Sequence, residues 1–523
     1  MTSFTAVMVQ YIVAIDIGTT TIRACLYDNK CQLVDSASDK INVEISGDGE
    51  LRVEIDPDRL FNQFLQVVSR VLKQCKDSDK VSMALCTQRN SFVCWDKITN
   101  KTLTKIICWS DGRARSTCIQ WNKSFTIKAL NAVGALLYLF THNPRFMAAR
   151  MLKFLSAMVS HRVMVTIQQS TALKNLLEFG QLGFGCLETW LLLKLTDGQV
   201  NVAEVSNYSS SGMFDPFIND YNKVILRIIG FPMTILPPLV DSASREPLGY
   251  VAQRLFSRNI PIYAVLADQQ SALYGCGGWK RGDMKISLGT GTFVDMNTGS
   301  TIHSSMTGLY PLVGWRVNSV PVFVAEGNDH DTAMVLKWAE SIGLYSNIAD
   351  TSDFARTVPN SNGVFFIPAF GGLQTPINDD TACCGFLGIR PDTTKAHMIR
   401  AILESIAFRV YQILETMRSE INNFGRPRIR ICGGVAANDF ICENIATLTG
   451  VTIERMKDPS FVASRGVALL AGYVQGMWTE EDLDCMIDVE KCFTPSMRNS
   501  SNVFRSYHMW LKAVQRCMKF YDT

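Results

Sequence analysis

The chain has 523 residues, which is more than one ordinary hydrophobic core holds, so two or three domains are expected. Hydrophobic residues make up 47% and charged residues 19%, a balance that excludes a disordered or fibrous protein. The net charge of +3 is small and no concentrated basic block stands out. Neither nucleic acid nor an acidic membrane surface is therefore indicated as a main partner.

Sixteen cysteines are scattered along the chain without any Cys-x-x-Cys pair, so the sequence indicates neither a zinc site nor a disulfide framework. Reduced thiols in a cytoplasmic protein fit this pattern better. The N-terminal stretch lacks the basic region of a signal peptide, and the apolar run at 133–140 is too short to span a bilayer. We expect a soluble, cytoplasmic protein without a transmembrane segment.

The first half of the chain opens with three apolar runs, at 11–18, 21–28 and 31–38, which predict an antiparallel meander because turn residues separate them. Asp56 followed by Pro57 predicts the start of a helix, and apolar residues recur at helical spacing up to Leu72. A buried strand is predicted at 81–86, and it ends in the polar stretch 87–90.

The second half repeats this order. It has a strand, a Gly/Thr turn and a strand at 282–299, and a further strand at 363–370. Helices are predicted at 396–421, 439–449 and 464–476, with a strand at 428–434 that runs into a Gly-Gly turn. The repeat predicts an internal duplication with a cleft between the halves and a boundary near 265–280.

Two of the turns follow strands and combine glycine with threonine. In the first, Asp16 precedes Gly18 and three threonines, Thr19, Thr20 and Thr21. Glycine lets the backbone approach an anion, while N–H and hydroxyl groups donate to phosphate oxygens, and a carboxylate such as Asp16 binds Mg²⁺. An ordinary hairpin turn explains the same residues. The second turn is Gly289-Thr290-Gly291.

A third turn, Gly433-Gly434, joins a strand to a helix near Asn438. Such a turn accepts a nucleotide, but Asn438 is also one of the best residues for capping a helix. Both interpretations stay open.

Polar residues also follow two further strands. Asp268 and Gln269 come directly after an apolar run, where a carboxylate is suited to take a proton from an acceptor hydroxyl in phosphoryl transfer. The alternative is a helix cap. Trp109 stands beside Asp111 and Arg113, and an indole in such a cluster covers the carbon skeleton of a small polyol. Here the alternative is a core tryptophan next to a surface ion pair.

Seven stretches resemble, in order, motifs of the FGGY-type carbohydrate kinase family, and among its members they are most similar to glycerol kinases. The stretches are "IDIGTTTIRACLYD", "TQRNSFVCWDKITNKTL", "WSDGRAR", "FGCLETWLLLKLTDG", "LADQQSALYG", "LGTGTFVDMNTG" and "HMIRAILESIAFR". The resemblance runs from about Tyr11 to Tyr521. The stretches "VEIDPDRLF" and "SNYSSSGMFDP" are similar to a divergent animal branch of these kinases.

The resemblance implies an α/β protein with the actin-like ATPase fold, in which two RNase H-like domains, 1–270 and 271–523, close a cleft on ATP, Mg²⁺ and glycerol or a similar polyol. Asp268 matches the general base, and we expect Arg89 to face it across the cleft. The remaining matches are polyol contacts (Arg89, Asn90, Trp109, Asp268, Gln269), ATP contacts (Thr19, Thr20, Thr21, Arg23, Gly289, Thr290, Ala333, Gly434, Asn438) and the metal residue Asp16.

The sequence departs from the family at several positions. Asn90 stands where glycerol kinases have a glutamate that binds two hydroxyls, Ala333 and Lys337 replace a glycine and a glutamine, and Cys432 replaces an aspartate. Residues 124–183 match poorly and are interpreted as a shortened region, without the family's Lys-x-x-Trp signature or its glycerol-contacting tyrosine.

Three hypotheses follow in this order: a glycerol kinase, a kinase of another small polyol or ketose, and a weakly active nucleotide-sensing interaction protein. We expect no nucleic-acid partner, and a homodimer stays open.

Overall fold

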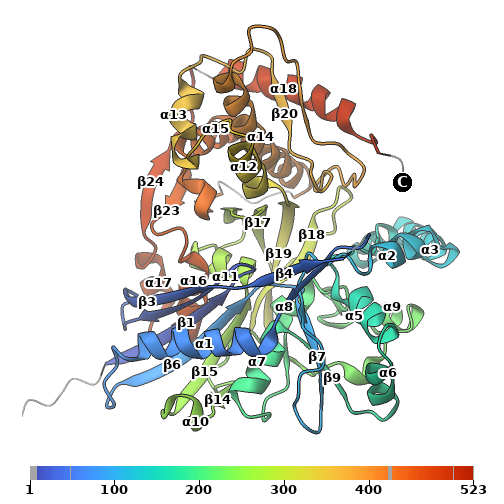
Figure 1. Ribbon diagram of the computed structural model, residues 1–523, viewed down its shortest axis with the longest axis vertical. Helices are drawn as coiled ribbons and strands as arrows, with labels where there is room; N and C mark the ends of the chain where they lie inside the picture. Colours follow the sequence, from blue (N-terminus) through green and yellow to red (C-terminus); the bar gives the residue numbers. More distant parts are fainter. Residues whose placement is uncertain (1–8, 48, 422–426, 499, 522–523) are drawn as a thin grey trace, which may run out of the picture. The chain divides into compact units, whose positions relative to one another are not determined.

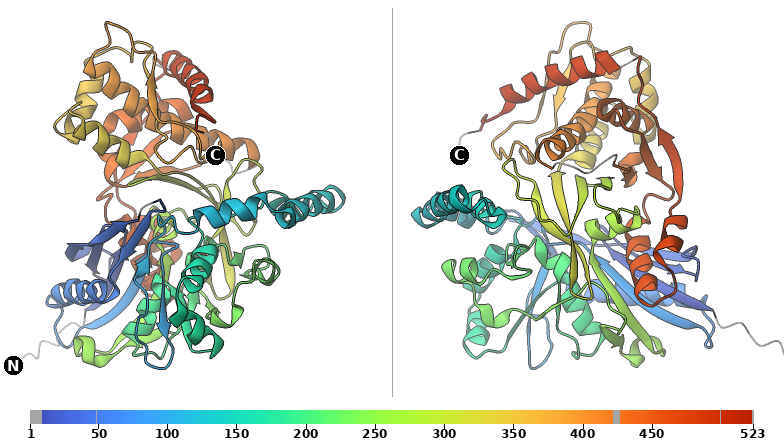
Figure 2. Two further views of the ribbon diagram at one scale, coloured as in Figure 1. Left: turned by 45° about the vertical axis from the view of Figure 1, so that its right-hand side comes forward. Right: turned by 180° about the vertical axis from the view of Figure 1, so that it is seen from behind.

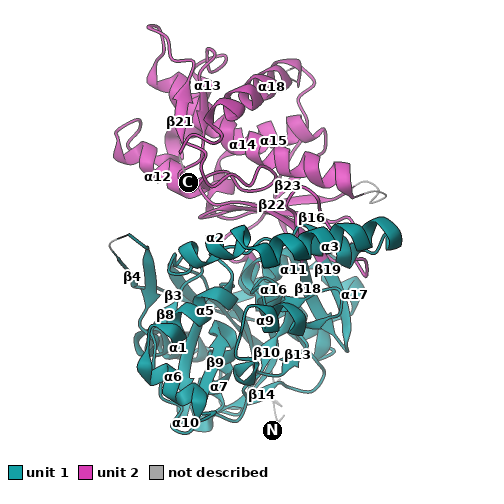
Figure 3. Cartoon of the chain, turned by 90° about the vertical axis from the view of Figure 1, so that its right-hand side faces the viewer, with its two compact units in different colours: residues 1–275, 312–323, 463–486 teal, residues 276–311, 324–462, 487–523 magenta. Residues whose placement is uncertain are grey.

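The computed structural model describes residues 9–47, 49–421, 427–498 and 500–521, and Figures 1 and 2 show it from three sides. It divides into two compact units (Figure 3). Unit 1 comprises Met1–Gly275, Leu312–Phe323 and Ala463–Met486, and unit 2 comprises Cys276–Pro311, Val324–Val462 and Ile487–Thr523. Each unit is thus assembled from separate stretches of the chain. The predicted domain boundary at 270/271 stays a prediction.

The main sheet of unit 1 has six strands in the order β14-β15-β6-β1-β2-β3. The strands are β1 (Gln10–Ile17), β2 (Thr21–Tyr27), β3 (Leu33–Lys40), β6 (Lys80–Thr87), β14 (Gly249–Val251) and β15 (Ile260–Ala267). The antiparallel pairing of β1 with β2 and of β2 with β3 confirms the predicted meander. β6 is parallel to both β1 and β15, and the near-continuous burial of these three strands is typical of parallel strands covered on both faces.

Helix α1 (Pro57–Leu72) packs against this sheet along β2 and β3 (Figure 1). It begins as predicted, because the Asp56 carboxylate accepts a hydrogen bond from the backbone N–H of Arg59 at 2.8 Å and Pro57 occupies the first helical position. Its buried face includes Leu60, Phe64 and Val67, at the spacing that predicted the helix.

A second, five-stranded sheet of unit 1 has the order β4-β5-β8-β7-β9. Its strands are β4 (Val43–Ser46), β5 (Arg52–Ile55), β7 (Phe92–Asp96), β8 (Ile106–Ile107) and β9 (Leu182–Cys186). The short pairs are β10 (Ala203–Glu204) with β13 (Leu239–Val240) and β11 (Phe214–Asp215) with β12 (Asp220–Tyr221). The buried helix α7 (Leu187–Leu195) follows β9 directly.

The other helices of unit 1 surround these sheets. They are α2 (Arg115–Lys123), α3 (Phe125–Thr141), α4 (Pro144–Arg150), α5 (Val159–Gln168), α6 (Thr171–Glu178), α8 (Val205–Ser209), α9 (Lys223–Ile228), η1 (Met233–Ile235), α10 (Gln253–Phe256), α11 (Asp268–Gly275), α16 (Val462–Val474) and α17 (Glu480–Cys485). Residues 124–183, predicted only as a poorly matched region, thus hold four helices, α3 to α6, and Figure 2 shows α3 extending away from the strands of unit 1. That this region is shortened stays a prediction.

The main sheet of unit 2 belongs to a seven-stranded sheet in the order β18-β19-β17-β16-β22-β23-β24, in which residues 312–323 of β18 and β19 are assigned to unit 1. The strands are β16 (Met284–Leu288), β17 (Thr292–Gly299), β18 (Tyr310–Val317), β19 (Val320–Asp329), β22 (Ile429–Cys432), β23 (Ile453–Met456) and β24 (Val489–Phe493). β16 is antiparallel to β17 and parallel to β22, which is parallel to β23. The run β17-β16-β22-β23 therefore has the same order and directions as β2-β1-β6-β15 of unit 1.

The remaining elements of unit 2 are α12 (Thr332–Ser341), η2 (Ile348–Asp350), α13 (Thr351–Arg356), β20 (Phe365–Ile367), β21 (Gly385–Leu387), α14 (Lys395–Glu420), η3 (Gly434–Ala437), α15 (Asp439–Thr449) and α18 (Ser500–Cys517). The predicted helices at 396–421 and 439–449 are confirmed. The strand predicted at 363–370 is shorter, since it ends before Pro368, which has no N–H for the ladder. All sixteen cysteines are free thiols.

Gly466 provides a test of how tightly α16 holds α11, the helix that begins at Asp268. A Cβ at Gly466 would lie 1.8 Å from the backbone oxygen of Ser271. Gly466→Ala should therefore lower the thermal unfolding midpoint by several degrees, because overpacking costs about 1–3 kcal/mol. Gly385→Ala is the matched control, since a Cβ there meets nothing within 4 Å. Equal midpoints of the two variants in a circular-dichroism melt would contradict this packing.

Candidate active site

The ends of three neighbouring parallel strands bring most of the predicted residues of unit 1 to one edge of its sheet. Ile17 of β1 and Ala267 of β15 both pair with Thr87 of β6, which lies between them. The turn 18–20, the stretch 88–90 and the pair 268–269 leave these strands in the same direction and at the same level. Ligands of open α/β sheets bind at such an edge.

The first Gly/Thr turn is a tight hairpin between β1 and β2. The N–H of Gly18 donates to the backbone oxygen of Thr21 at 3.0 Å. Thr20 is exposed, whereas the Thr19 hydroxyl accepts a hydrogen bond from the indole Nε1 of Trp109 at 3.0 Å. The predicted phosphate turn and the predicted polyol residue Trp109 are therefore in direct contact.

Asp16, the predicted metal residue, is half-buried at the end of β1 and pairs across the strands with Arg23 of β2. Burial raises the pKa of Asp16 to about 6, while Arg23 lowers it and the Asp268 carboxylate raises it. The side chain is therefore mostly ionised at neutral pH, and a nearby cation would favour the ionised form further.

Arg89 and Asp268 meet at this edge. The Nε of Arg89 lies 3.8 Å from Oδ1 of Asp268, and their side chains are 9% and 26% exposed. Both belong to unit 1 and follow the adjacent strands β6 and β15, so the two side chains meet at one edge of the sheet. Their proximity comes from strand pairing within one sheet.

Asp268 is the first residue of α11. A place at the start of a helix is compatible with both interpretations, the helix cap and the proton acceptor. Its Oδ1 accepts from the backbone N–H of Gln269 at 2.9 Å, and the Gln269 side-chain amide donates to Oδ2 at 3.3 Å. The carboxylate keeps enough exposure to accept a proton from a hydroxyl placed beside it.

Asn90 follows Arg89 in a left-handed conformation with φ of 58°, which asparagine adopts more readily than most residues. Its side-chain oxygen accepts from the Ser210 hydroxyl at 3.0 Å. Its backbone oxygen accepts from Arg162, a fully buried arginine whose guanidinium also donates to the backbone oxygen of Cys108, the residue before Trp109.

Arg162 was not found by sequence reasoning, although it ties the segments of two predicted polyol residues, Asn90 and Trp109, to one another. Burial lowers its pKa to about 10, so it stays charged at neutral pH. A lone arginine in the apolar run "HRVMV" was the available signal.

Asp111 and Arg113, the charged neighbours of Trp109, bind each other and strand β5. Both are buried, with Arg113 Nε 2.6 Å from Asp111 Oδ1, and the alternative of a surface ion pair is therefore wrong. Arg113 further bonds Glu54 at 2.6 Å, and Asp111 accepts from the N–H of Val53 at 2.8 Å. These contacts attach the Trp109 segment to β5.

A buried carboxylate, Glu204, forms a second positioning network that sequence reasoning missed. It is fully buried at the start of α8, where several hydrogen-bond donors surround its carboxylate. The donors are the N–H groups of Ser206 and Asn207, the side-chain amide of Asn207 and the hydroxyls of Ser206 and Ser242. Burial raises the pKa of Glu204, and the hydrogen bonds lower it.

The partners of Glu204 reach the ends of two central strands. The Ser206 hydroxyl accepts from the backbone N–H of Ala267, the last residue of β15, at 2.9 Å. The side-chain oxygen of Asn207 accepts from the Thr87 hydroxyl, at the end of β6, at 3.1 Å. The Glu204 network thus holds the ends of β15 and β6, the strands that Asp268 and Arg89 follow.

Unit 2 presents its predicted residues at the ends of two parallel strands. Ser287 of β16 pairs with Cys432 of β22, so the turns 289–291 and 433–434 leave at one level. Gly433 has a φ of 91°, and a Cβ there would lie 2.4 Å from the backbone oxygen of Leu288. At Gly434 a Cβ meets nothing within 4 Å, so this exposed glycine leaves room for a ligand.

The turn at Gly289 and Thr290 is joined to the start of α12. The N–H of Ala333 donates to the backbone oxygen of Thr290 at 3.1 Å, while the hydroxyls of Thr292 and Thr332 lie 2.7 Å apart. Gly289 and Ala333 are half-buried and Thr290 is exposed. The structure therefore groups the predicted residues Gly289, Thr290 and Ala333.

Asn438 caps α15, which confirms the capping interpretation. Its Oδ1 accepts from the N–H of Ile441 at 3.2 Å, and its Nδ2 donates to the Thr351 hydroxyl at 3.0 Å. Cys432, where an aspartate was expected, is buried, with its sulfur 3.2 Å from the Ser287 hydroxyl. A hydrogen bond from Cys276 and the charge of Lys285 lower the pKa of Cys432 to about 7.

No group of three or more His, Cys, Asp or Glu side chains suited to a metal ion occurs in 9–47, 49–421, 427–498 and 500–521. Magnesium does not need such a group, because it commonly takes one or two carboxylates and completes its shell with phosphate oxygens and water. Asp16 beside the first turn fits that mode of binding.

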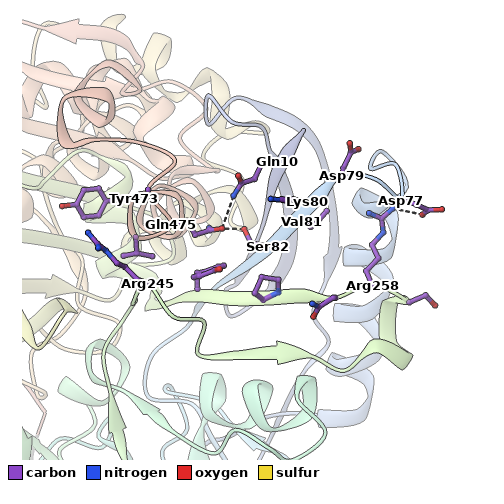
Figure 4. A pocket seen from close by; sticks show the side chains of 16 residues that line it. Gln10, Asp77, Asp79, Lys80, Val81, Ser82, Arg245, Arg258, Tyr473 and Gln475 are labelled. Carbon is purple, nitrogen blue, oxygen red and sulfur yellow. Dashed lines mark hydrogen bonds and ion pairs between the residues drawn. The ribbon is translucent and has the colours of Figure 1, made fainter. Parts of the chain in front are cut away.

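A hollow of about 840 Å³ in unit 1 lies away from these turns (Figure 4). It is lined by Gln10 and Lys80, the first residues of β1 and β6, at the strand ends farthest from the turns. Arg245, Arg258 and Gln475 also line it. None of the predicted site residues lines it, so it is not part of the candidate site.

Comparisons with known proteins agree with this geometry. The model of the FGGY family of carbohydrate kinases, N-terminal domain, matches residues 11–275, and that of the C-terminal domain matches residues 284–474. Glycerol kinase 5 of Danio rerio is 38% identical over 98% of this chain and 97% of that protein. Glycerol kinase 5 of Homo sapiens is 36% identical over 98% of this chain and 96% of that protein.

Solved structures show the same fold. Glycerol kinase of Plasmodium falciparum with ADP superposes with a TM-score of 0.85 at 24% identity, covering 98% of both chains. Gluconate kinase of Lactobacillus acidophilus has a TM-score of 0.80 at 17% identity, covering 97% of this chain and 98% of that one. The predicted α/β, actin-like ATPase fold is confirmed, while the predicted cleft between domains stays a prediction.

Glu204→Gln should loosen the ends of β6 and β15. Its amide would point N–H groups at existing donors, and buried donors without acceptors cost about 1–3 kcal/mol each. We expect a lower thermal midpoint and, by hydrogen exchange with mass spectrometry, faster exchange in the peptide that contains Ala267. Glu246→Gln, the same change at an exposed residue, is the control. Unchanged exchange at Ala267 would contradict the positioning role.

Proposed function

Because the chain belongs to the FGGY family of carbohydrate kinases, we propose that it transfers the terminal phosphoryl group of ATP to glycerol, giving sn-glycerol 3-phosphate. The family membership, and the resemblance to the animal branch named glycerol kinase 5, confirm what the sequence motifs predict. The observation that carries the proposal is the Asp268 carboxylate beside Arg89, at the same sheet edge as the Gly18–Thr20 hairpin.

Asp268 takes the proton of the acceptor hydroxyl as the oxygen attacks phosphorus. Phosphoryl transfer depends mainly on positioning and charge neutralisation, so the further requirement is a held acceptor. Arg89, Asn90 and Gln269 donate to and accept from its other hydroxyls, and Trp109 covers its carbon atoms. The hydrogen bond from Trp109 to Thr19 sets the indole next to the hairpin that faces the phosphates.

The phosphate chain of ATP is held by two Gly/Thr turns in this proposal. Thr19, Thr20, Thr21 and Arg23 contribute from residues 1–270, the acceptor-binding domain. Residues 271–523, the nucleotide-binding domain, contribute Gly289, Thr290, Ala333, Gly434 and Asn438. Because the Asn438 side chain is engaged in capping, we propose that it positions the start of α15 beside the nucleotide and does not itself donate a hydrogen bond to it.

Asp16 is the residue that would hold Mg²⁺, and the metal would supply charge neutralisation at the phosphates. The Asp16 pKa of about 6 fits this role, because the carboxylate is mostly ionised at neutral pH. We place the reaction in the cytoplasm, where the free thiols of this chain stay reduced.

A second candidate is a kinase of another small polyol or ketose, and Asn90 favours it. The Asn90 side-chain oxygen already accepts from Ser210, and the amide carries no charge. A carboxylate at this position would accept from two hydroxyls, so an amide relaxes the preference for glycerol.

Asp268→Asn should lower kcat for ADP release with glycerol by about 10²–10⁴-fold, because the amide cannot take the proton. The Michaelis constant for ATP should change little. Asp77→Asn, the same change at an exposed residue, is the control in the coupled assay. The proposal fails if wild type and Asp268→Asn are equally silent across a panel of polyols and sugars.

Asn90→Glu should raise kcat/KM for glycerol by about tenfold relative to larger polyols and ketoses, since a carboxylate binds two hydroxyls beside Arg89. A small loss of stability is expected too, because glutamate tolerates the φ of 58° less well than asparagine. Asn90→Gln, which has the length of glutamate without its charge, is the control. If both variants leave the ranking of acceptors unchanged, residue 90 does not set specificity.

A further inference from the structure

Helix α3 carries large apolar side chains on its exposed surface. Val133, Leu136, Leu137, Leu139 and Phe140 are between 37% and 75% exposed, and we call these five residues the apolar stripe. Positions 133, 136, 137 and 140 have helical spacing and share one face, which Leu139 extends. Figure 2 shows the helix extending away from the strands of unit 1.

The stripe is not needed for packing within the described part of unit 1. The opposite face of α3 packs on α4 through Gly134, where a Cβ would lie 2.7 Å from the backbone N of Arg150. Ile127 on the same helix is also buried. The helix thus has one face packed against the protein and a separate exposed apolar face. Contiguous exposed apolar area generally marks an interaction surface.

The stripe lies in a segment with one sign of charge. Between Asp111 and Glu178 the sequence has no acidic residue and nine basic ones: Arg113, Arg115, Lys123, Lys128, Arg145, Arg150, Lys153, Arg162 and Lys174. Arg113 and Arg162 are buried, and Arg145 pairs with Asp215 at 2.8 Å. Arg115, Lys123, Lys128, Arg150 and Lys153 are exposed around the hairpin of α3 and α4.

The foot of this hairpin is firmly attached. Asn122 and Phe154 exchange two hydrogen bonds of 2.8 Å, and the Phe154 ring contacts Trp121 and His161. In the described part of the chain no single helix is long and apolar enough to cross a bilayer. Helices α2 and α3 reach that length and composition only together, but they meet at a bend of 57° where Lys123 lies.

We propose that α3 docks this protein on the surface of an anionic phospholipid bilayer. The apolar stripe enters the boundary between headgroups and acyl chains, and the exposed lysines and arginines around it contact lipid phosphates. The helix lies in the plane of the surface, because the bend and Lys123 oppose a crossing.

Charge and shape favour lipid over a second copy of this chain. Two copies joined through their stripes would bring together two segments whose exposed charges are all positive, which is repulsive. The stripe also belongs to a single helix, α3, whose exposed side chains project from it. An anionic bilayer satisfies both the apolar area and the charge.

The test is sedimentation of the full-length protein with vesicles of phosphatidylcholine, with and without phosphatidylserine. Wild type should bind the mixed vesicles and lose most binding in high salt. Phe140→Ser should weaken binding about tenfold by removing buried apolar area. Phe179→Ser is the matched control, since both phenylalanines are 75% exposed and Phe179 lies outside the stripe. Lys128→Glu with Arg150→Glu should abolish the preference for phosphatidylserine.

Circular-dichroism melts of each variant verify that it is folded. Equal binding of Phe140→Ser and Phe179→Ser would overturn the proposal, as would equal binding to both kinds of vesicle. Sedimentation velocity tests the alternative, in which a second copy of this chain occupies the stripe. A wild-type dimer that Phe140→Ser converts to monomers, without vesicle binding by either, would assign the stripe to self-association and overturn the proposal.

Discussion

The parallel register of β1, β6 and β15 is the constraint on which the acceptor side of the site depends. Because Ile17, Thr87 and Ala267 end at one level, the hairpin, Arg89 and Asp268 are neighbours without any long-range closure. Two buried ionic groups secure this arrangement. Glu204 fixes the ends of β6 and β15 through Ser206 and Asn207, and Arg162 joins the segments of Asn90 and Trp109. A buried charge with several hydrogen bonds is costly to displace, which keeps these positions fixed.

Unit 2 uses the same strand order for a different purpose. Its turns need small residues, since a Cβ at Gly433 or Gly291 would meet backbone oxygen at 2.4 Å and 2.6 Å. Gly434 and Thr290 stay exposed beyond them, so the backbone, and not charged side chains, forms the surface offered to a ligand. In unit 1, by contrast, Asp16, Arg23, Arg89 and Asp268 supply charge. In the proposed reaction, neutralisation and proton transfer therefore belong to unit 1, and close backbone approach to unit 2.

Local patterns in the sequence were sufficient for the strands, turns and helix starts. The cap at Asp56, the hairpin at Gly18 and the helix beginning at Asp439 depend on residues a few positions apart, and the structure has them as predicted. Arg162 and Glu204 were missed because their partners lie far along the chain, and a charged residue in an apolar run does not reveal its partner. The pairing of β6 with β15, which brings Arg89 to Asp268, likewise joins residues far apart in the chain.

Averages over the whole chain do not describe the segment around α3. A net charge of +3 describes the sum over 523 residues, yet 112–177 contains all its charge in one sign. The apolar run at 133–140 was judged by whether it is long enough to cross a bilayer, which is a question of length alone. Lying on a bilayer is a question of which side chains are exposed together and what charge surrounds them. Only the structure answers that, because it shows that Gly134 faces α4 while Leu136 and Phe140 do not.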